Sequence, residues 1–125
     1  MGDITFAGNK KLKSINKEWC GKFNHIYLSF AGPDGKFQGD WSVNHSTVRA
    51  KKDASEMATT GNMKVKTFEA RYKDTFGTQV EIKYEKNGRL YRSLDEHNDM
   101  TLSQFDKWAE EHGASKPLEA HPEWF

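Results

Sequence analysis

The chain has very little cysteine and proline: one Cys, at position 20, and three Pro among 125 residues. One cysteine cannot form an intrachain disulfide, which fits a reducing compartment. No apolar run is long enough to span a bilayer, and the first residues lack the charged-then-apolar pattern of a secretory signal. We therefore expect a cytoplasmic protein that does not enter a membrane.

Aromatic residues, by contrast, are plentiful, with eight Phe, four Trp and four Tyr. They supply enough apolar surface for a folded core. The net charge of +1 conceals an asymmetry, because residues 1–52 carry nine Lys or Arg and four Asp or Glu, whereas residues 53–125 carry ten and fourteen. This distribution indicates two solvated surfaces of opposite sign, or a basic face that meets an anionic partner.

Two stretches of the chain resemble each other. Residues 8–23 match residues 61–76 after a shift of 53 positions, with five identities in sixteen. The matched apolar residues recur at i, i+3, i+7 and i+11, which predicts one buried stripe on a helix in each stretch. These stripes are Leu12, Ile15, Trp19 and Phe23, and Val65, Phe68, Tyr72 and Phe76.

An alternating run follows each predicted helix, which indicates a strand with one buried face. A turn signal comes next, at residues 33–35 in the first stretch and 86–88 in the second. A second strand is predicted after each turn. For the second turn we predict a three-residue loop with Gly88 in a left-handed bulge, because this register would pair Tyr84 with Leu90 and gather the apolar residues on one face. Asn24 and Gly77 are predicted to end the two helices in the left-handed conformation.

The expected fold is α+β, formed by tandem duplication of a strand–helix–strand–strand(–helix) unit. Its sheet is mostly antiparallel, with the helices on one face. We expect a single domain over residues 1–125, built of two repeats at about 3–54 and 56–113, with a C-terminal tail at 114–125. A last helix should begin at Thr101, where Thr-Leu-Ser-Gln is a capping box.

The segment from Lys64 through Phe76-Gly77, with the following run from Val80 to Tyr84, resembles a group of short uncharacterised bacterial proteins. Those proteins have a Lys-Thr-led helix that ends in Phe-Gly before a β-hairpin. The resemblance covers about a third of the chain. It implies a bacterial origin and a shared fold, and it carries no activity.

The densest group of potential ligands is Asp95-Glu96-His97-Asn98-Asp99. Carboxylates with one imidazole could hold a divalent cation through Asp95, His97 and Asp99. The alternative is that this acidic segment favours the N-terminus of the next helix. A small hydrolase using the same segment is a further interpretation.

Both matched stretches begin with a turn that leads into a helix N-terminus, a setting that can hold phosphate. The candidate anion-binding residues are Asn9, Lys10 and Lys11, and Asn62 and Lys64. The alternative is a turn that both copies inherited.

The tail ends in Trp124-Phe125, and an exposed pair of this kind should dock in an apolar groove of its own domain or of a partner. No catalytic constellation emerges, and no cofactor is expected. The first hypothesis is a non-enzymatic module that binds a protein partner, of an accessory or immunity type. The second is nucleic-acid binding through the basic first repeat, with Tyr27, Phe37 or Trp41 as stacking surfaces. Monomer and homodimer both remain open.

Overall fold

The computed structural model describes residues 4–51 and 57–125. It is an α+β fold with two antiparallel sheets. The elements of the first half are β1 (Ile4–Thr5), α1 (Leu12–Lys22), β2 (Tyr27–Phe30) and the short 3-10 helix η1 (His45–Val48). Those that follow are β3 (Ala58–Thr59), α2 (Val65–Phe76), β4 (Val80–Lys86), β5 (Arg89–Arg92), η2 (Asp95–His97), α3 (Leu102–Glu111), α4 (Pro117–Ala120) and η3 (Pro122–Trp124).

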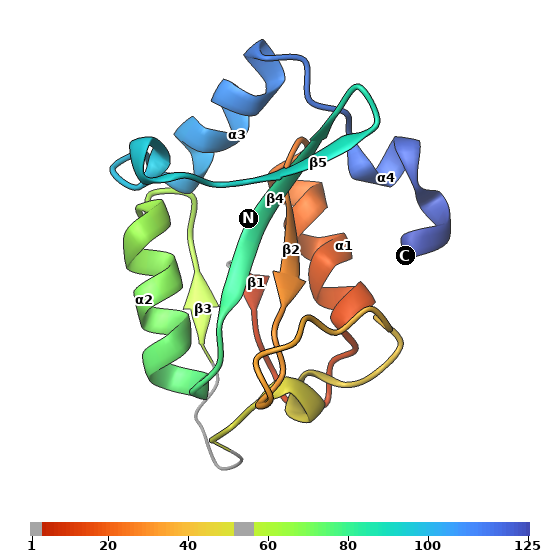
Figure 1. Cartoon of the computed structure of the whole chain (residues 1–125), viewed down its shortest axis with the longest axis vertical. Coiled ribbons are helices and arrows are strands. Elements are labelled where there is room, and N and C mark those ends of the chain that lie inside the picture. The colour runs from red at the N-terminus through yellow and green to blue at the C-terminus, as the bar shows by residue number, and fades with distance from the viewer. Residues whose placement is uncertain (1–3, 52–56) are drawn as a thin grey trace.

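The predicted apolar stripes form the core. All eight stripe residues are buried, as are Ile26 just before β2, Leu28 and Phe30 on β2, and Val80, Ile82 and Tyr84 on β4. β2 and β4 run through the middle of the molecule, with α1 and α2 on either side and α3 at one end (Figure 1). No helix within the described ranges has both the length and the apolar character needed to cross a membrane.

The two halves meet through corresponding residues. Thr5 pairs with Ala58 across β1 and β3, and Leu28 pairs with Ile82 across β2 and β4. The spacings are 53 and 54 residues, the same as in the sequence match. Each central strand therefore has the corresponding strand of the other half as its neighbour.

The main chain repeats its contacts as well. In the first half the N–H groups of Leu12 and Lys13 donate to the carbonyls of Val43 and Trp41. The corresponding bonds in the second half run from Val65 to Met100 and from Lys66 to Asn98. These recurring contacts support an internal duplication, which we propose as the origin of the two halves.

Of the predicted helix ends, those at Gly77 and Thr101 are confirmed and the one at Asn24 is wrong. Gly77 ends α2 in the left-handed conformation with φ 79°, and Thr101 and Gln104 form the capping box of α3. The prediction for Asn24 is wrong, because Asn87 is the one non-glycine residue of the described chain with positive φ. The backbone of α1 instead leaves the helix at Phe23 in an extended conformation.

The prediction of a three-residue loop in the second hairpin is also wrong. Asn87 and Gly88 form a two-residue turn with φ 54° and 78°, and Tyr84 pairs with Tyr91. This register turns Leu90 and Leu94 away from the core, with exposed fractions of 53% and 50%. In the first half the described residues form no second hairpin strand after β2. The chain makes a single bridge between Ala31 and Phe37 and then leaves the sheet.

Candidate functional site: an aromatic pocket on the outer face of the sheet

The outer face of the three-stranded sheet carries a pocket of about 470 Å³. Its floor consists of outward side chains of the three strands: Tyr27, Ser29, Lys83 and Leu90. Its walls are the loop after β2 and the C-terminal tail, which contribute Phe37, Gln38, Gly39, Asp40, Trp41, Glu123 and Trp124. The volume lies within the range of about 300–1,000 Å³ typical of ligand sites.

Main-chain bonds hold the loop that forms one wall. The carbonyl of Trp41 accepts the N–H of Lys13, and that of Val43 accepts the N–H of Leu12. These are N–H groups at the start of α1, which lack partners inside the helix. Neither Lys11 nor Lys64 caps its helix with a side chain, so the loop performs the capping and is fixed beside the sheet as a result.

The tail forms the opposite wall, and it docks on its own chain as one of the two sequence alternatives predicted. The ring of Trp124 lies 5.3 Å from Tyr27 and 5.6 Å from Trp41, and Phe125 lies 5.9 Å from Trp41, measured between centroids. These separations are typical of favourable aromatic pairs. Trp41 is thus the ring that joins the loop to the tail.

His121 attaches the tail to the sheet through Glu85 on β4. Nε2 of His121 lies 2.7 Å from Oε1 of Glu85, and Nδ1 lies 3.2 Å from Oε2 of Glu123. The His121 ring stacks on Trp124 at 3.9 Å with an interplanar angle of 4°. Burial lowers the pKa of His121, but hydrogen bonds to the two carboxylates outweigh this effect and raise the pKa above its usual value.

Charges of both signs surround the pocket. Hydrogen bonds from Ser42 lower the pKa of Asp40, and a hydrogen bond from the backbone together with His121 lowers that of Glu123. Both side chains are therefore anionic near neutral pH. Lys83 supplies a cation, and its Nζ lies 5.1 Å from the centroid of Phe37. Burial, followed by the charge of Glu85, raises the pKa of Tyr27 to about 12, so its hydroxyl stays protonated.

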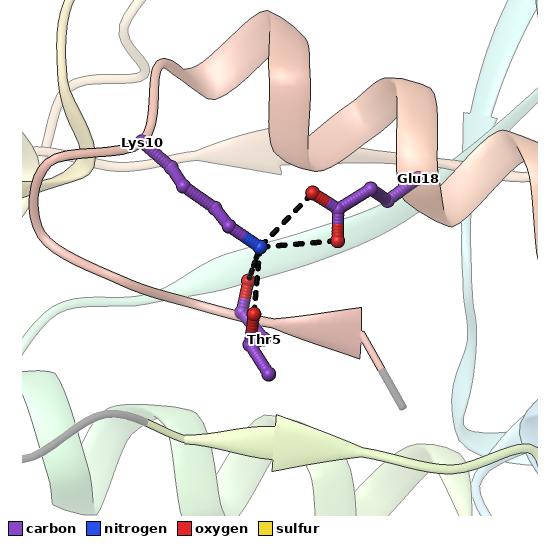
Figure 2. Close-up of polar contacts among 3 residues, drawn as sticks. All are labelled: Thr5, Lys10 and Glu18. Atoms are coloured by element: carbon purple, nitrogen blue, oxygen red, sulfur yellow. Dashed lines mark hydrogen bonds and ion pairs between the residues drawn. The ribbon is translucent and has the colours of Figure 1, made fainter. Parts of the chain in front are cut away.

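The predicted anion-binding residues either bond within the protein or lie at its surface. Lys10 Nζ donates to Thr5 Oγ1 at 2.6 Å and forms an ion pair with Glu18 at 2.9 Å (Figure 2). The N–H groups that open α1 and α2 donate to carbonyls of the protein itself, as described above. The side chains of Asn9, Lys11, Asn62 and Lys64 are exposed. The turns that these residues form thus serve the fold.

The predicted metal ligands are also separated. His97 is buried against the rings of Phe105 and Trp108, and its Nδ1 accepts the N–H of Leu94. Asp99 points to Lys66, with which it forms an ion pair of 2.8 Å. Across residues 4–51 and 57–125, no group of three His, Cys, Asp or Glu side chains is arranged to hold a metal ion.

Asp95 and Glu96 instead line a second, polar pocket of about 590 Å³ between α2 and the end of β5. Glu69 and Ser93 also line this pocket, and the Ser93 hydroxyl donates to Glu69 at 3.4 Å. Burial raises the pKa of Glu69. The segment proposed for a small hydrolase therefore contributes two exposed carboxylates and no histidine to this pocket.

Sequence reasoning identified Tyr27, Phe37, Trp41 and Trp124 as candidate binding residues, and the structure gathers all four in one pocket. It missed Leu90 and Lys83. The signal for Leu90 was present, since Asn-Gly between alternating residues is the strongest indication of a two-residue turn. No family model, no curated protein and no solved structure matches the chain.

Proposed function

We propose that the protein is a non-enzymatic binding module that holds an apolar segment of a partner protein in the aromatic pocket. One observation carries this proposal: a pocket of ligand size is walled by aromatic rings and flanked by two apolar side chains that face solvent. These two are Phe37, with 42% of its surface exposed, and Leu90. Apolar side chains exposed beside a preformed pocket are typical of recognition sites.

The mixed charge around the pocket favours a protein segment over nucleic acid. Asp40 and Glu123 would repel a phosphate backbone, and Lys83 is the one cationic lining residue in the described part of the chain. Tyr27 is only 3% exposed, so a base cannot stack on its face. Nucleic-acid binding remains the second candidate because the three rings suggested for stacking converge.

The proposal is tested by selecting peptides from a random library displayed on phage, using the whole chain as bait. We expect apolar sequences that compete with the dye 8-anilinonaphthalene-1-sulfonate. Their binding should weaken about tenfold in Leu90→Ser, because Leu90 lines the pocket. Leu94→Ser is the matched control, since Leu94 is equally exposed and lies outside the pocket.

Equal weakening in both variants, or a selection that yields no competing peptide, would contradict the proposal. A parallel titration with a single-stranded oligonucleotide tests the second candidate. Binding that falls steeply with added salt and is lost in Trp41→Ala would favour nucleic acid instead.

A further inference from the structure

We infer that β5 is the edge to which an extended partner segment adds as a fourth strand, and that apolar and acidic residues alternate in this segment. The inference rests on the proposed function and names its partner class. It follows from the position of Leu90, which belongs both to the aromatic pocket and to this edge.

The sheet order β2-β4-β5 leaves β5 at an edge. Ser93 N–H donates to the carbonyl of Ile82 on β4 at 2.9 Å. Main-chain groups in an antiparallel ladder alternate in direction, so those of Leu90 and Arg92 point away from β4. Outside that ladder, the described residues make no hydrogen bond to the main chain of either residue. An added strand would find two donors and two acceptors there.

The side chains of this edge alternate apolar and basic on the outer face. Leu90 and Arg92 share that face, because Leu90 pairs with Glu85 and Arg92 with Lys83, both outward on β4. All four residues of β5 are exposed. A complementary strand would therefore place an apolar side chain opposite Leu90 and an acidic one opposite Arg92.

The guanidinium of Arg92 can bind a carboxylate of the partner segment in addition to that of Glu81. Its Nη1 lies 3.4 Å from Oε2 of Glu81, and 65% of its side chain is exposed. An ion pair so exposed is weak, and a guanidinium has donors for more than one carboxylate. The other charged residue of the edge is Arg89, also exposed and basic. Both charges of β5 thus favour an acidic strand.

The same charges disfavour a second copy of the chain. Pairing of β5 with β5 of another molecule would bring two Arg89 and two Arg92 side chains to one junction, where like charges repel. It would also leave the aromatic pocket beside Leu90 without an apolar side chain from a longer partner. An extended partner with an acidic residue opposite Arg92 and an apolar residue beside Leu90 suits both the edge and the pocket.

The test uses an acetylated peptide in which Leu, Glu and Leu alternate with Thr, titrated against the whole chain by calorimetry. We expect about tenfold weaker binding when Lys replaces Glu in the peptide, and the reverse order of affinities for Arg92→Glu. Arg71→Glu is the matched control, because it makes the same charge change at an exposed position of α2.

N-methylation of the peptide then tests strand addition without altering the protein. Methyl groups on alternate amides of one set should abolish binding, since they block the bonds to Leu90 and Arg92. Methyl groups on the intervening amides should leave binding within about twofold. Equal loss for both sets would overturn the inference, as would a dimer detected by light scattering that the peptide does not dissociate.

The two proposals fail in distinguishable ways. If the peptide does not bind while library peptides still compete with the dye in a Leu90-dependent manner, the edge is not used and the pocket remains a binding site. If the peptide binds through its amides with no effect of Leu90→Ser, the edge is used and the pocket is not.

Discussion

Nε2 of His45 lies 2.7 Å from the hydroxyl of Tyr72, with both side chains fully buried. On the other side of the ring, Nε of Arg49 donates to Nδ1 of His45 at 2.9 Å. Since Nδ1 is an acceptor, the ring proton resides on Nε2 and is donated to Tyr72. The imidazole is therefore a neutral link in a hydrogen-bonded chain through the core.

Removing the tyrosine hydroxyl should destabilise the protein. In Tyr72→Phe the buried N–H of His45 loses its acceptor, for which we expect a loss of about 1–3 kcal/mol in the free energy of unfolding. Tyr84→Phe is the matched control, because the hydroxyl of Tyr84 makes no hydrogen bond within the described residues and should change stability by less than about 0.5 kcal/mol. Urea unfolding of both variants measures the difference.

His45 also makes the free energy of unfolding depend on pH. Burial, followed by the charge of Arg49, lowers the pKa of His45 to about 3. The unfolded chain takes up this proton below about pH 6.5, whereas the folded chain does not. Stability should therefore fall as the pH drops from about 6.5 towards 3. Unfolding experiments across this range should show a shallower fall in His45→Gln, and an unchanged slope would contradict the assignment.

Substituting two glycines that have nearly equal φ angles can distinguish the cost of backbone strain from that of a steric clash. Gly77 and Gly88 have φ of 79° and 78°. A Cβ at Gly88 would meet nothing within 4 Å, whereas one at Gly77 would lie 3.0 Å from Cβ of Ala50. We expect Gly88→Ala to lose about 1–2 kcal/mol from the left-handed conformation, and Gly77→Ala to lose more. Thermal unfolding of the two variants checks this order.

The attachment of the tail should weaken as the pH rises. The pKa of His121 is raised in the folded state, so its contribution is complete below the unfolded pKa of about 6.5 and is lost as the pH rises through the folded value. The indole N–H signal of Trp124 in NMR spectra should report this change. Glu85→Gln should shift the transition to lower pH, while Glu119→Gln, which alters a carboxylate paired with Lys116, should not.

The core could be predicted because its signals are local. The stripe from Val65 to Phe76 and the alternation from Val80 to Tyr84 depend on spacings of a few residues, which secondary structure fixes directly. The hairpin register was missed because the prediction assumed that Leu90 belongs to the core. The dipeptide Asn87-Gly88 favours a two-residue turn, and the structure has this turn.

The site was only half accessible to sequence reasoning. Trp41 and Trp124 were each recognisable as aromatic residues without a place in a stripe. Their contact joins positions 83 residues apart and depends on how the tail folds back, which no local spacing encodes. The buried pairing of His45 with Tyr72 has the same character, since it links η1 to α2.

The pairing of β2 with β4 makes the stability of the chain and the occupation of its pocket a single linked equilibrium. The strands that form the pocket floor also carry the core on their other face, and they come from both halves. A ligand bound there at one hundred times its dissociation constant should raise the free energy of unfolding of the whole chain by about 2.7 kcal/mol. Thermal shift can therefore reveal a partner before its chemistry is known.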